Sequence, residues 1–528
     1  MNPAALTIFA SYLTAIAIIA YFGAKKVRTV EDFVAASGQL GFWTYILLMV
    51  GSVFSGMSLI GVAGLAFTTG WANVWERIFG PAFAIAFGTI VIGYKLFPLK
   101  EKYKLVTIQD YLAFRYRDAK TIRLLAAIVS AITSYIYLIG QYTAIGIASE
   151  VILGIPYWLG VIMAALIVVA YVSSGGMFST AWTTFAQSLL MIIGVFLTVP
   201  LIISHVGGIE HINSALASMP ELQKAKGFEE DFMFAKYLND PFAPANVPLA
   251  GWVYNLTLFG IAVPLGLMVA PHVVNNMLTF KKREYTRWGP IVMYLLGFST
   301  IFLTSLAGIA ARVAWAEGKI EIPEIKLGEI SVKWSDMAYP TIASAFLPEW
   351  LFLLLLPTIL AGVMSTTDRL IVTTASNITY DILAKAFGLN VNGRKFKVIN
   401  AIVVFAVGLS SIYFALHPQQ LLAWLIWASL SLMANCFFFP IILGLYWSGM
   451  TKNGARASMI SGLLMTILTF AIHGKTVWIS GIPVYSVLPG FIASFLSGIL
   501  VSVIEKRVGV ARPVESPSLI GGRMAGGQ

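Results

Sequence analysis

Two neighbouring hydroxyl residues, Ser365 and Thr366, lie in a long apolar stretch of the chain, one helical turn after Gly362. Because residues three and four apart on a helix share a face, these three and Arg369 stack on one side. Two hydroxyls beside a small residue form a compact patch of oxygen atoms, which suits a hard monovalent cation. Serine and threonine in membrane helices also often donate back to their own helix, so the patch alone leaves both interpretations open.

A second group of residues has the chemistry to hold an organic solute. The guanidinium of Arg77 would meet a carboxylate on an organic acid, with Glu76 beside it. Tyr254, Asn255 and Trp424 fit the wall or outer gate of a pocket. The alternative is that these charged and aromatic side chains only mark the membrane interface, where such residues are common.

His272, near the end of another apolar stretch, is either a buried histidine with a structural role or a proton carrier. The sequence contains no phosphate-binding glycine loop, no histidine and cysteine cluster with metal-ligand spacing, and no nucleophile with a base. We therefore predict that the protein is not an enzyme.

The elements that position these residues are set by a very apolar composition. Of 528 residues, 58% are hydrophobic and 11% are charged, whereas soluble domains carry about 25% charged residues. This composition predicts a polytopic, all-α membrane protein. The single cysteine, Cys436, excludes an internal disulfide and is expected to be a small buried side chain.

Runs of about 20 apolar residues predict about thirteen transmembrane helices. They lie near 4–23, 42–68, 75–99, 123–150, 157–173, 178–204, 251–279, 288–316, 346–379, 398–416, 420–447, 455–473 and 484–504. One set of loops and the tail hold 25 basic residues, and the opposite loops hold 9. The bias predicts an external N-terminus and a cytoplasmic C-terminus in the cell membrane.

Two of these stretches, 51–64 and 259–272, contain glycines and prolines that interrupt a helix. A backbone group freed inside a bilayer must bond to protein, solute or ion. Such breaks at corresponding places in two halves of a membrane protein indicate a transporter with its site near the midplane.

The order and spacing of several short segments resemble the sodium:solute symporter family over nearly all of residues 1–504. The similarity is closest to the pantothenate, proline and monocarboxylate branches. The segments that carry it are Ser55-Gly-Met-Ser-Leu-Ile-Gly61, Thr107-Ile-Gln-Asp-Tyr111, Gly154-Ile-Pro-Tyr157, Gly175-Gly-Met177 through Gln187, Pro271-His272, Leu360-Ala-Gly-Val-Met-Ser-Thr366, Pro440 through Trp447, and Lys452-Asn-Gly-Ala-Arg-Ala-Ser458.

The resemblance implies a leucine-transporter-type core of five spans repeated in inverted orientation, with the first span of each repeat broken. It also implies that Na+ binds to the carbonyls of Gly51, Phe54 and Gly362 and to the hydroxyls of Ser365 and Thr366. For the solute, we assign Ser55, Ser58 and Gln141, with Glu76 matching a carboxylate that contacts substrate in the sugar-transporting branch.

The sequence departs from many relatives at two carboxylates, which are replaced here by Val53 and Thr184. It also carries Asp368 and Arg369 inside a span, where charge is costly and suggests a function. Three interpretations stay open: a structural or snorkelling ion pair, Asp368 as a relocated sodium ligand, and Arg369 as a fixed positive charge in place of a cation.

We accordingly predict six regions. They are a leading helix and cytoplasmic loop (1–41), the first repeat (42–204), an external loop (205–250), the second repeat (251–447), two peripheral helices (448–504) and a cytoplasmic tail (505–528). The expected function is sodium-coupled uptake of a small organic solute, either a carboxylate such as a monocarboxylate or pantothenate, or an amino acid such as proline. The alternative is a proton-coupled or cation-independent carrier of the same fold. No nucleic acid or protein partner is implied.

Overall fold

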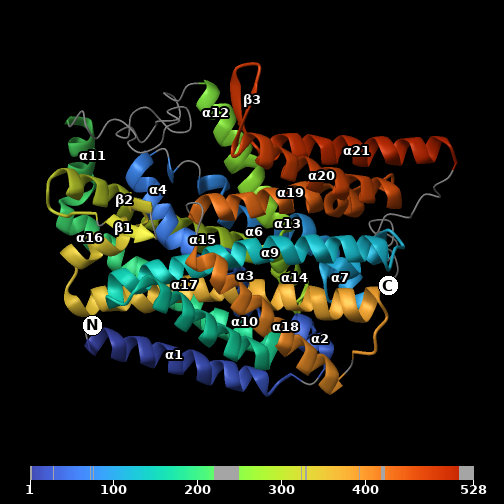
Figure 1. Cartoon of the computed structure of the whole chain (residues 1–528), viewed down its shortest axis with the longest axis horizontal. Coiled ribbons are helices and arrows are strands. Elements are labelled where there is room, and N and C mark those ends of the chain that lie inside the picture. Colours follow the sequence, from blue (N-terminus) through green and yellow to red (C-terminus); the bar gives the residue numbers. More distant parts are fainter. Residues whose placement is uncertain are drawn as a thin grey trace.

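Long helices that run in roughly the same direction make up most of the molecule (Figure 1). The computed structural model describes residues 3–27, 29–71, 73–74, 77–218, 249–322, 324–327, 330–333, 335–391, 393–417 and 422–509. Eleven helices in these ranges are long and apolar enough to cross a membrane, and a bent pair makes a twelfth span. The expected range 157–173 is a shorter apolar helix, Tyr157–Ser173, so the described part accounts for all thirteen expected ranges.

The first half of the chain begins with a peripheral helix and two short elements, followed by the first broken span. Its elements are α1 (Pro3–Ala24), α2 (Val30–Ala35), η1 (Ala36–Gly38), α3 (Phe42–Val53), η2 (Met57–Gly61), α4 (Val62–Thr69), η3 (Arg77–Phe79), α6 (Pro81–Gly88), η4 (Thr89–Gly93), α7 (Tyr94–Tyr103), α8 (Ile108–Arg115), α9 (Thr121–Ala148), η5 (Ser149–Leu153), α10 (Tyr157–Val206) and α11 (Gly208–Ser218).

The second half contains the other broken span and the remaining long helices. Its elements are α12 (Leu249–Asn255), η8 (Leu256–Ala262), α13 (Val263–Val269), α14 (Pro271–Asn276), α15 (Tyr285–Ala316), β1 (Glu324–Leu327), β2 (Ile330–Lys333), η9 (Ser335–Met337), α16 (Ala338–Phe346), α17 (Glu349–Ser376), η10 (Asn377–Ala386), α18 (Gly393–Leu416), α19 (Leu422–Tyr446), α20 (Lys452–His473), β3 (Thr476–Ile479), β4 (Ile482–Tyr485) and α21 (Val487–Arg507).

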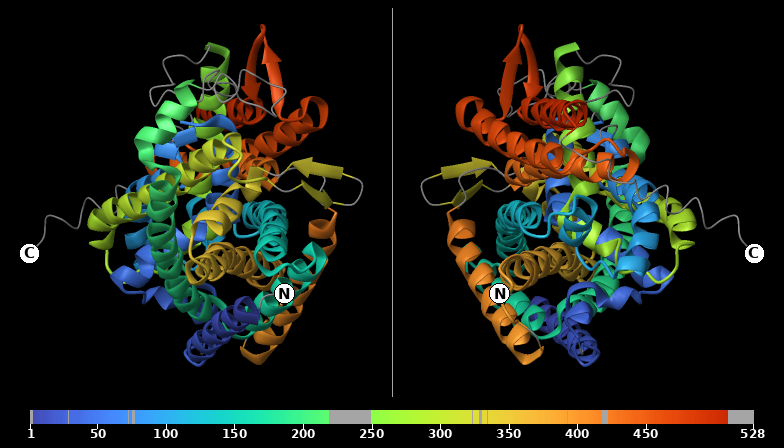
Figure 2. Two further views of the ribbon diagram at one scale, coloured as in Figure 1. Left: turned by 90° about the vertical axis from the view of Figure 1, so that its left-hand side faces the viewer. Right: turned by 90° about the vertical axis from the view of Figure 1, so that its right-hand side faces the viewer.

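Among the described residues, the strands that depart from the all-α expectation form two antiparallel hairpins in connecting segments. Strand β1 pairs with β2, with Glu324 opposite Lys333, and β3 pairs with β4, with Thr476 opposite Tyr485. Both hairpins lie at the edge of the helical bundle (Figure 2). Because neither enters a span, the structure stays nearly all-helical.

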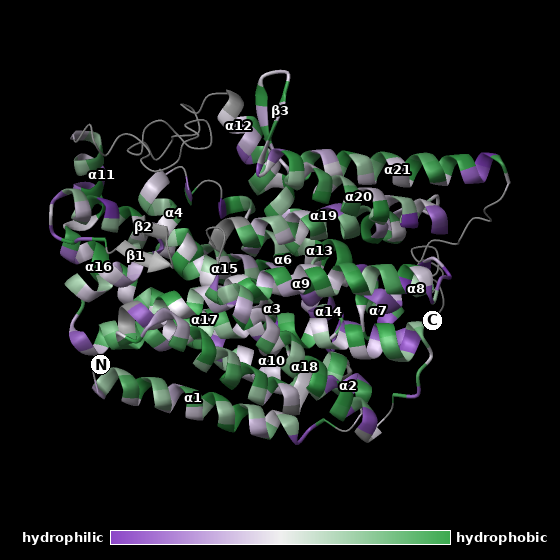
Figure 3. Ribbon diagram, viewed as in Figure 1, coloured by the Kyte–Doolittle hydropathy of each residue, from purple (hydrophilic) through white to green (hydrophobic). Residues whose placement is uncertain are grey.

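Helix α17 lies at the centre of the bundle. Every residue from Leu355 to Ser376 is buried, and the helix packs against α9, α10 and α3. Peripheral helices α1, α20 and α21 instead expose large apolar side chains such as Phe22, Leu464 and Leu500. Hydrophilic residues gather mostly towards the two ends of the bundle (Figure 3), as the lipid environment requires.

The predicted spans 157–173 and 178–204 meet at a kink rather than at a loop. Gly176 has a φ of 47° and a ψ of −143°, which breaks the regular backbone of α10. A Cβ atom at this position would lie 2.6 Å from the ring of Phe33, so both the left-handed φ and the close packing require glycine. The kink gives α10 two limbs, and both reach α17.

Candidate functional site

The first predicted break lies between α3 and η2. Helix α3 ends at Val53, Phe54 has an extended backbone with φ −88° and ψ 97°, and the segments on either side are bent by 67°. Gly56 permits the close approach of α9, because a Cβ atom there would lie 2.3 Å from the Cβ of Ala144. The break therefore frees backbone carbonyls deep in the bundle.

Helix α17 presents two hydroxyls to these carbonyls. Ser365 Oγ lies 3.0 Å from Gly51 O and 2.9 Å from Gly362 O. Thr366 Oγ1 lies 3.1 Å from Gly51 O and 3.3 Å from Phe54 O. The structure thus brings together all five oxygens that the family resemblance assigned to one cation, and both hydroxyl residues are fully buried.

This arrangement bears on the two interpretations of the hydroxyl patch. Ser365 does donate to a carbonyl of its own helix, but both hydroxyls also reach across to α3. By contrast, the next residue, Thr367, donates only to Val363 O on α17, at 2.8 Å. The contacts across the helix pair go beyond ordinary bonding within a helix. That the five oxygens bind sodium stays a prediction.

The side chain of Asp368 is directed into α10. Its two carboxylate oxygens accept hydrogen bonds from the hydroxyls of Tyr171 and Thr183, the second at 3.2 Å. Thr183 is the neighbour of Thr184, the position at which many relatives carry a carboxylate. Asp368 therefore reaches the helix from which that carboxylate is missing.

Arg369 points elsewhere and makes no direct ion pair with Asp368. Among the described residues, no carboxylate oxygen lies within 4.0 Å of its guanidinium nitrogens. Its Nη1 contacts the sulfur of Met177. A direct contact between the two charges is therefore not formed among the described residues, and the three interpretations of Asp368 and Arg369 stay open.

Three of the predicted solute residues gather around the break. Gln141 Oε1 accepts a hydrogen bond from the Gly56 backbone N–H at 3.2 Å. Ser58 Oγ lies 3.3 Å from the backbone nitrogen of Ser55. Tyr137 Oη lies 3.5 Å from Ser55 Oγ. Tyr137 was not among the predicted solute residues, although its position one turn before Gln141 on α9 places both on one face.

For three other predicted solute residues, Arg77, Tyr254 and Asn255, the structure gives different surroundings. Arg77 is buried, donates from Nε to Asn73 Oδ1 at 3.4 Å, and lies 5.2 Å from the ring centre of Phe259. Tyr254 packs edge-on against Tyr485 of β4, with ring centres 5.9 Å apart. Asn255 ends α12 and is half-buried.

Two further solute candidates, Glu76 and the side chain of Trp424, fall outside the described residues. The loop segment 219–248 and residues 510–528 of the tail also do. On the described side of the predicted outer mouth, Trp71 Nε1 donates to Asn213 Oδ1 of α11 at 2.8 Å. This bond links the end of α4 to the first part of the predicted external loop.

The second predicted break is narrower than the sequence suggested. Residues 256–262 form the π-helical turn η8, and the helix is interrupted only at Ala270, with φ −55° and ψ 127°. After it, α14 is tied to two other elements. Asn276 Nδ2 donates to Ser52 Oγ at 2.6 Å, and Asn275 Oδ1 accepts from the Ile108 backbone N–H at 2.9 Å. Pro271 starts α14 and explains the position of the break.

A buried charge network near one end of the bundle was not predicted. Arg123 Nη1 lies 2.7 Å from Asp110 Oδ1 and 2.8 Å from Asp381 Oδ1. Thr107 caps α8 through Asp110 and also donates to Asp381 at 3.1 Å. The network therefore joins α8, α9 and η10. Only the capping spacing of Thr107 and Asp110 was visible in the sequence.

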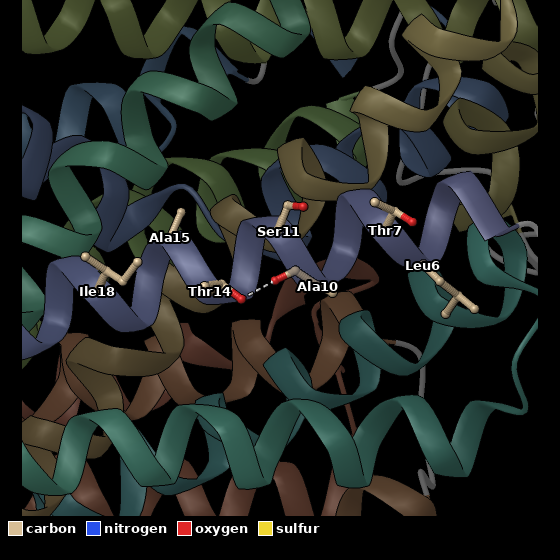
Figure 4. A pocket seen from close by; sticks show the side chains of 7 residues that line it. All are labelled: Leu6, Thr7, Ala10, Ser11, Thr14, Ala15 and Ile18. Carbon is tan, nitrogen blue, oxygen red and sulfur yellow. Dashed lines mark hydrogen bonds between the residues drawn. The ribbon is translucent and has the colours of Figure 1, made fainter.

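A shallow depression on the surface of α1 is separate from the candidate site (Figure 4). It consists of small, hydroxyl and aliphatic side chains on one face of that helix. They are Leu6, Thr7, Ala10, Ser11, Thr14, Ala15 and Ile18. None of the residues assigned to the ion or the solute contributes to it.

Comparisons with known proteins agree with this geometry. The sequence profile of the sodium:solute symporter family matches residues 33–462. The osmoregulated proline transporter OpuE of Bacillus subtilis (strain 168) is 26% identical over 514 residues, which cover 94% of each chain. A Na+-coupled sialic acid symporter, solved in a substrate-bound outward-open state, has a TM-score of 0.72 at 16% identity, and the match covers 95% of this chain and 98% of that one. The predicted fold class is confirmed.

Proposed function

The chain belongs to the sodium:solute symporter family, and we propose that it carries a small organic solute into the cell together with sodium. The solute is a carboxylate, such as a monocarboxylate or pantothenate, or an amino acid such as proline. The similarity to a protein named as a proline transporter supports the last of these. Family and relative alike indicate a transporter rather than an enzyme.

The observation that carries the proposal is the buried oxygen cluster at the break in α3. Two hydroxyls and three carbonyls from two distant parts of the chain converge there, as a hard cation requires. When sodium binds, the hydroxyls turn their O–H bonds away and present lone pairs to the ion. The ion then holds α17 against the broken span.

Coupling follows from the position of the cluster beside Ser55 and Gln141. An ion that stabilises one arrangement of the break also stabilises the groups that bind the solute. The ion drives uptake only to the extent that it binds the two states with different affinity. In this scheme the N-terminus lies outside the cell, the C-terminus lies in the cytoplasm, and the six regions keep the bounds given above.

A second candidate function, a proton-coupled or cation-independent carrier, is favoured by the charges on α17. Asp368 is a buried ionisable group inside a span, the kind of position at which proton relays use carboxylates. Arg369 supplies a positive charge without an ion. Both features are compatible with the fold described above, so the alternative carrier needs no different architecture.

Uptake into proteoliposomes separates the two functions. Labelled L-proline, lactate and pantothenate are offered with an inward gradient of sodium, of protons, or of neither. We expect accumulation of at least one solute under the sodium gradient, with choline unable to replace sodium. Equal accumulation with choline, or accumulation only with the proton gradient, would contradict the sodium-coupled function.

A further inference from the structure

Arg369 is a buried cation with Asp368 as its neighbour in sequence, but among the described residues no carboxylate oxygen lies within 4.0 Å of its guanidinium. Its side chain is 1% exposed, and its contact with the Met177 sulfur is with a weak acceptor. Its Nε and Nη2 atoms have no hydrogen-bond partner among the described residues. Burying a cation in this way is costly unless an acceptor is supplied. The unpaired atoms form the side of the guanidinium that binds a carboxylate through two parallel bonds.

His272 lies at the start of α14, and α14 packs against α17, the helix that carries Arg369. The imidazole is fully buried, and both of its ring nitrogens lack a hydrogen-bond partner in the described part of the chain. A neutral imidazole always carries one N–H donor, whichever tautomer it adopts. The pair therefore offers at least three buried donors that no described group accepts.

This pair is connected to the break in α3 by side-chain contacts. The ring of His272 packs edge-on against Tyr137, with centres 5.9 Å apart, and the Tyr137 hydroxyl lies 3.5 Å from Ser55 Oγ. One turn along α9, Gln141 Nε2 is also buried and has no hydrogen-bond partner within the described ranges. Unsatisfied donors thus extend from the solute residues at the break to Arg369.

We propose that Arg369 and His272 form a second station for the carboxylate of the transported solute, beyond its first site at the break. The proposal rests on the proposed function and specifies its solute as an acid. The guanidinium fork binds both carboxylate oxygens, while the imidazole donates one more bond. The solute would pass from Ser55 and Gln141 towards this pair before release.

The chemistry of the two clusters explains why the station takes an anion. Ser365, Thr366 and their carbonyl partners offer only oxygen atoms, which suit a cation. Arg369 and His272 offer unsatisfied N–H donors and a positive charge. The charge repels a cation, and the donors bind an acceptor. Chloride would satisfy the same charge, but it lacks the two oxygens that match the guanidinium fork.

Thermal unfolding of the purified protein, at a constant sodium concentration with a counter-anion that is not a carboxylate, such as fluoride, tests the proposal. Three acids are each compared with a counterpart that lacks the carboxylate: L-proline with L-prolinamide, lactate with lactamide, and pantothenate with panthenol. We expect one acid to stabilise the wild-type protein, and its apparent affinity to fall about tenfold or more in Arg369→Gln. Arg369→Lys keeps the charge without the fork and should recover only part of that affinity.

Arg312→Gln is the matched control. Arg312, in α15, is 3% exposed and also has unpartnered Nε and Nη2 atoms in the described structure, but it packs on Phe67 and Trp315. We expect this variant to keep the preference for the acid. If Arg312→Gln lost the preference for the acid as fully as Arg369→Gln, removal of any buried arginine would have this effect. That result would contradict the proposal.

Other outcomes would also overturn the proposal. One is an unchanged preference for the acid in folded Arg369→Gln or, if that variant does not fold, in Arg369→Lys. A second is the absence of any preference for an acid in the wild-type protein, and a third is that sodium chloride alone reproduces the stabilisation. Stabilisation of the wild-type protein by sodium without solute is measured separately. If sodium stabilises the protein but the acid preference fails, only this inference is overturned. If sodium does not stabilise the wild-type protein, the result counts against the proposed function.

Discussion

The hydroxyl of Ser365 lies 3.0 Å from the carbonyl oxygen of Gly51, although the two residues are 314 positions apart in the chain. Gly51 belongs to the last turn of α3 before its break, and Ser365 lies in the middle of the most buried helix. An ion bound between them therefore connects the broken span to the centre of the bundle. We propose this connection as the structural basis for coupling an ion to a solute.

Asp368 supplies the first prediction. Its carboxylate reaches Thr183, next to the position where many relatives have a carboxylate. We expect Asp368→Asn to weaken sodium affinity more than solute affinity, because it removes negative charge near the ion and leaves Ser55 and Gln141 in place. Sodium-dependent and solute-dependent thermal stabilisation, measured on the same purified variant, give the two affinities.

A second substitution distinguishes a charge effect from a packing effect in this experiment. We expect Thr184→Asp to restore sodium affinity in the Asp368→Asn background, because it returns a carboxylate to α10. Thr183→Val, which removes only a hydroxyl donor, should have a smaller effect than Asp368→Asn. A well-folded Asp368→Asn protein with wild-type sodium dependence would eliminate the role of Asp368 as a relocated ligand.

The shared arginine of the charge network gives a stability prediction. Arg123→Gln leaves two buried carboxylates without their cation, a change that typically costs about 3–5 kcal/mol. The ion pair of Arg456 with Asp118 is more exposed, with 28% of the arginine side chain accessible, and such pairs contribute about 0–1 kcal/mol. We expect the larger loss of thermal stability in Arg123→Gln than in Arg456→Gln, and equal losses would contradict this account of the network.

Membrane orientation is tested by single cysteines in a Cys436→Ser background. Lys319 follows α15 and Lys395 lies near the start of α18, and both are exposed. The distribution of basic residues places Lys319 outside and Lys395 in the cytoplasm. An impermeant thiol reagent applied to intact cells should label Lys319→Cys and not Lys395→Cys. The reverse pattern would mean that the predicted orientation is inverted.

The sequence predicted the parts of the fold that depend on local patterns. Apolar runs gave the spans, and the glycine and serine residues at 51–56 gave the break between α3 and η2. The five oxygens of the predicted ion site came from a family pattern. They meet in the structure because the side of α17 that carries Ser365 and Thr366 is turned to the break. Both hydroxyls are thereby directed to the carbonyls there.

Contacts that depend on how helices rotate and pack were not predictable in this way. The ring of Tyr254 turns to Tyr485, a residue more than two hundred positions away. Arg123 meets Asp381 through a contact between α9 and η10 that no local pattern encodes. Asp368 and Arg369 are adjacent in sequence, but successive residues on a helix point about 100° apart, so they reach different partners.

The sodium dependence of the double variant Ser365→Ala and Thr366→Ala tests the central claim most directly. Each substitution removes a hydroxyl contact to a charged ligand. Such a contact typically contributes about 1.5–3 kcal/mol, which corresponds to about tenfold or more in affinity. Thr367→Ala is the control, because that hydroxyl bonds within its own helix. With thermal stabilisation measured across a sodium titration, the account predicts a large rightward shift for the double variant and an unchanged curve for Thr367→Ala. A folded double variant that follows the wild-type curve would contradict sodium binding at this site.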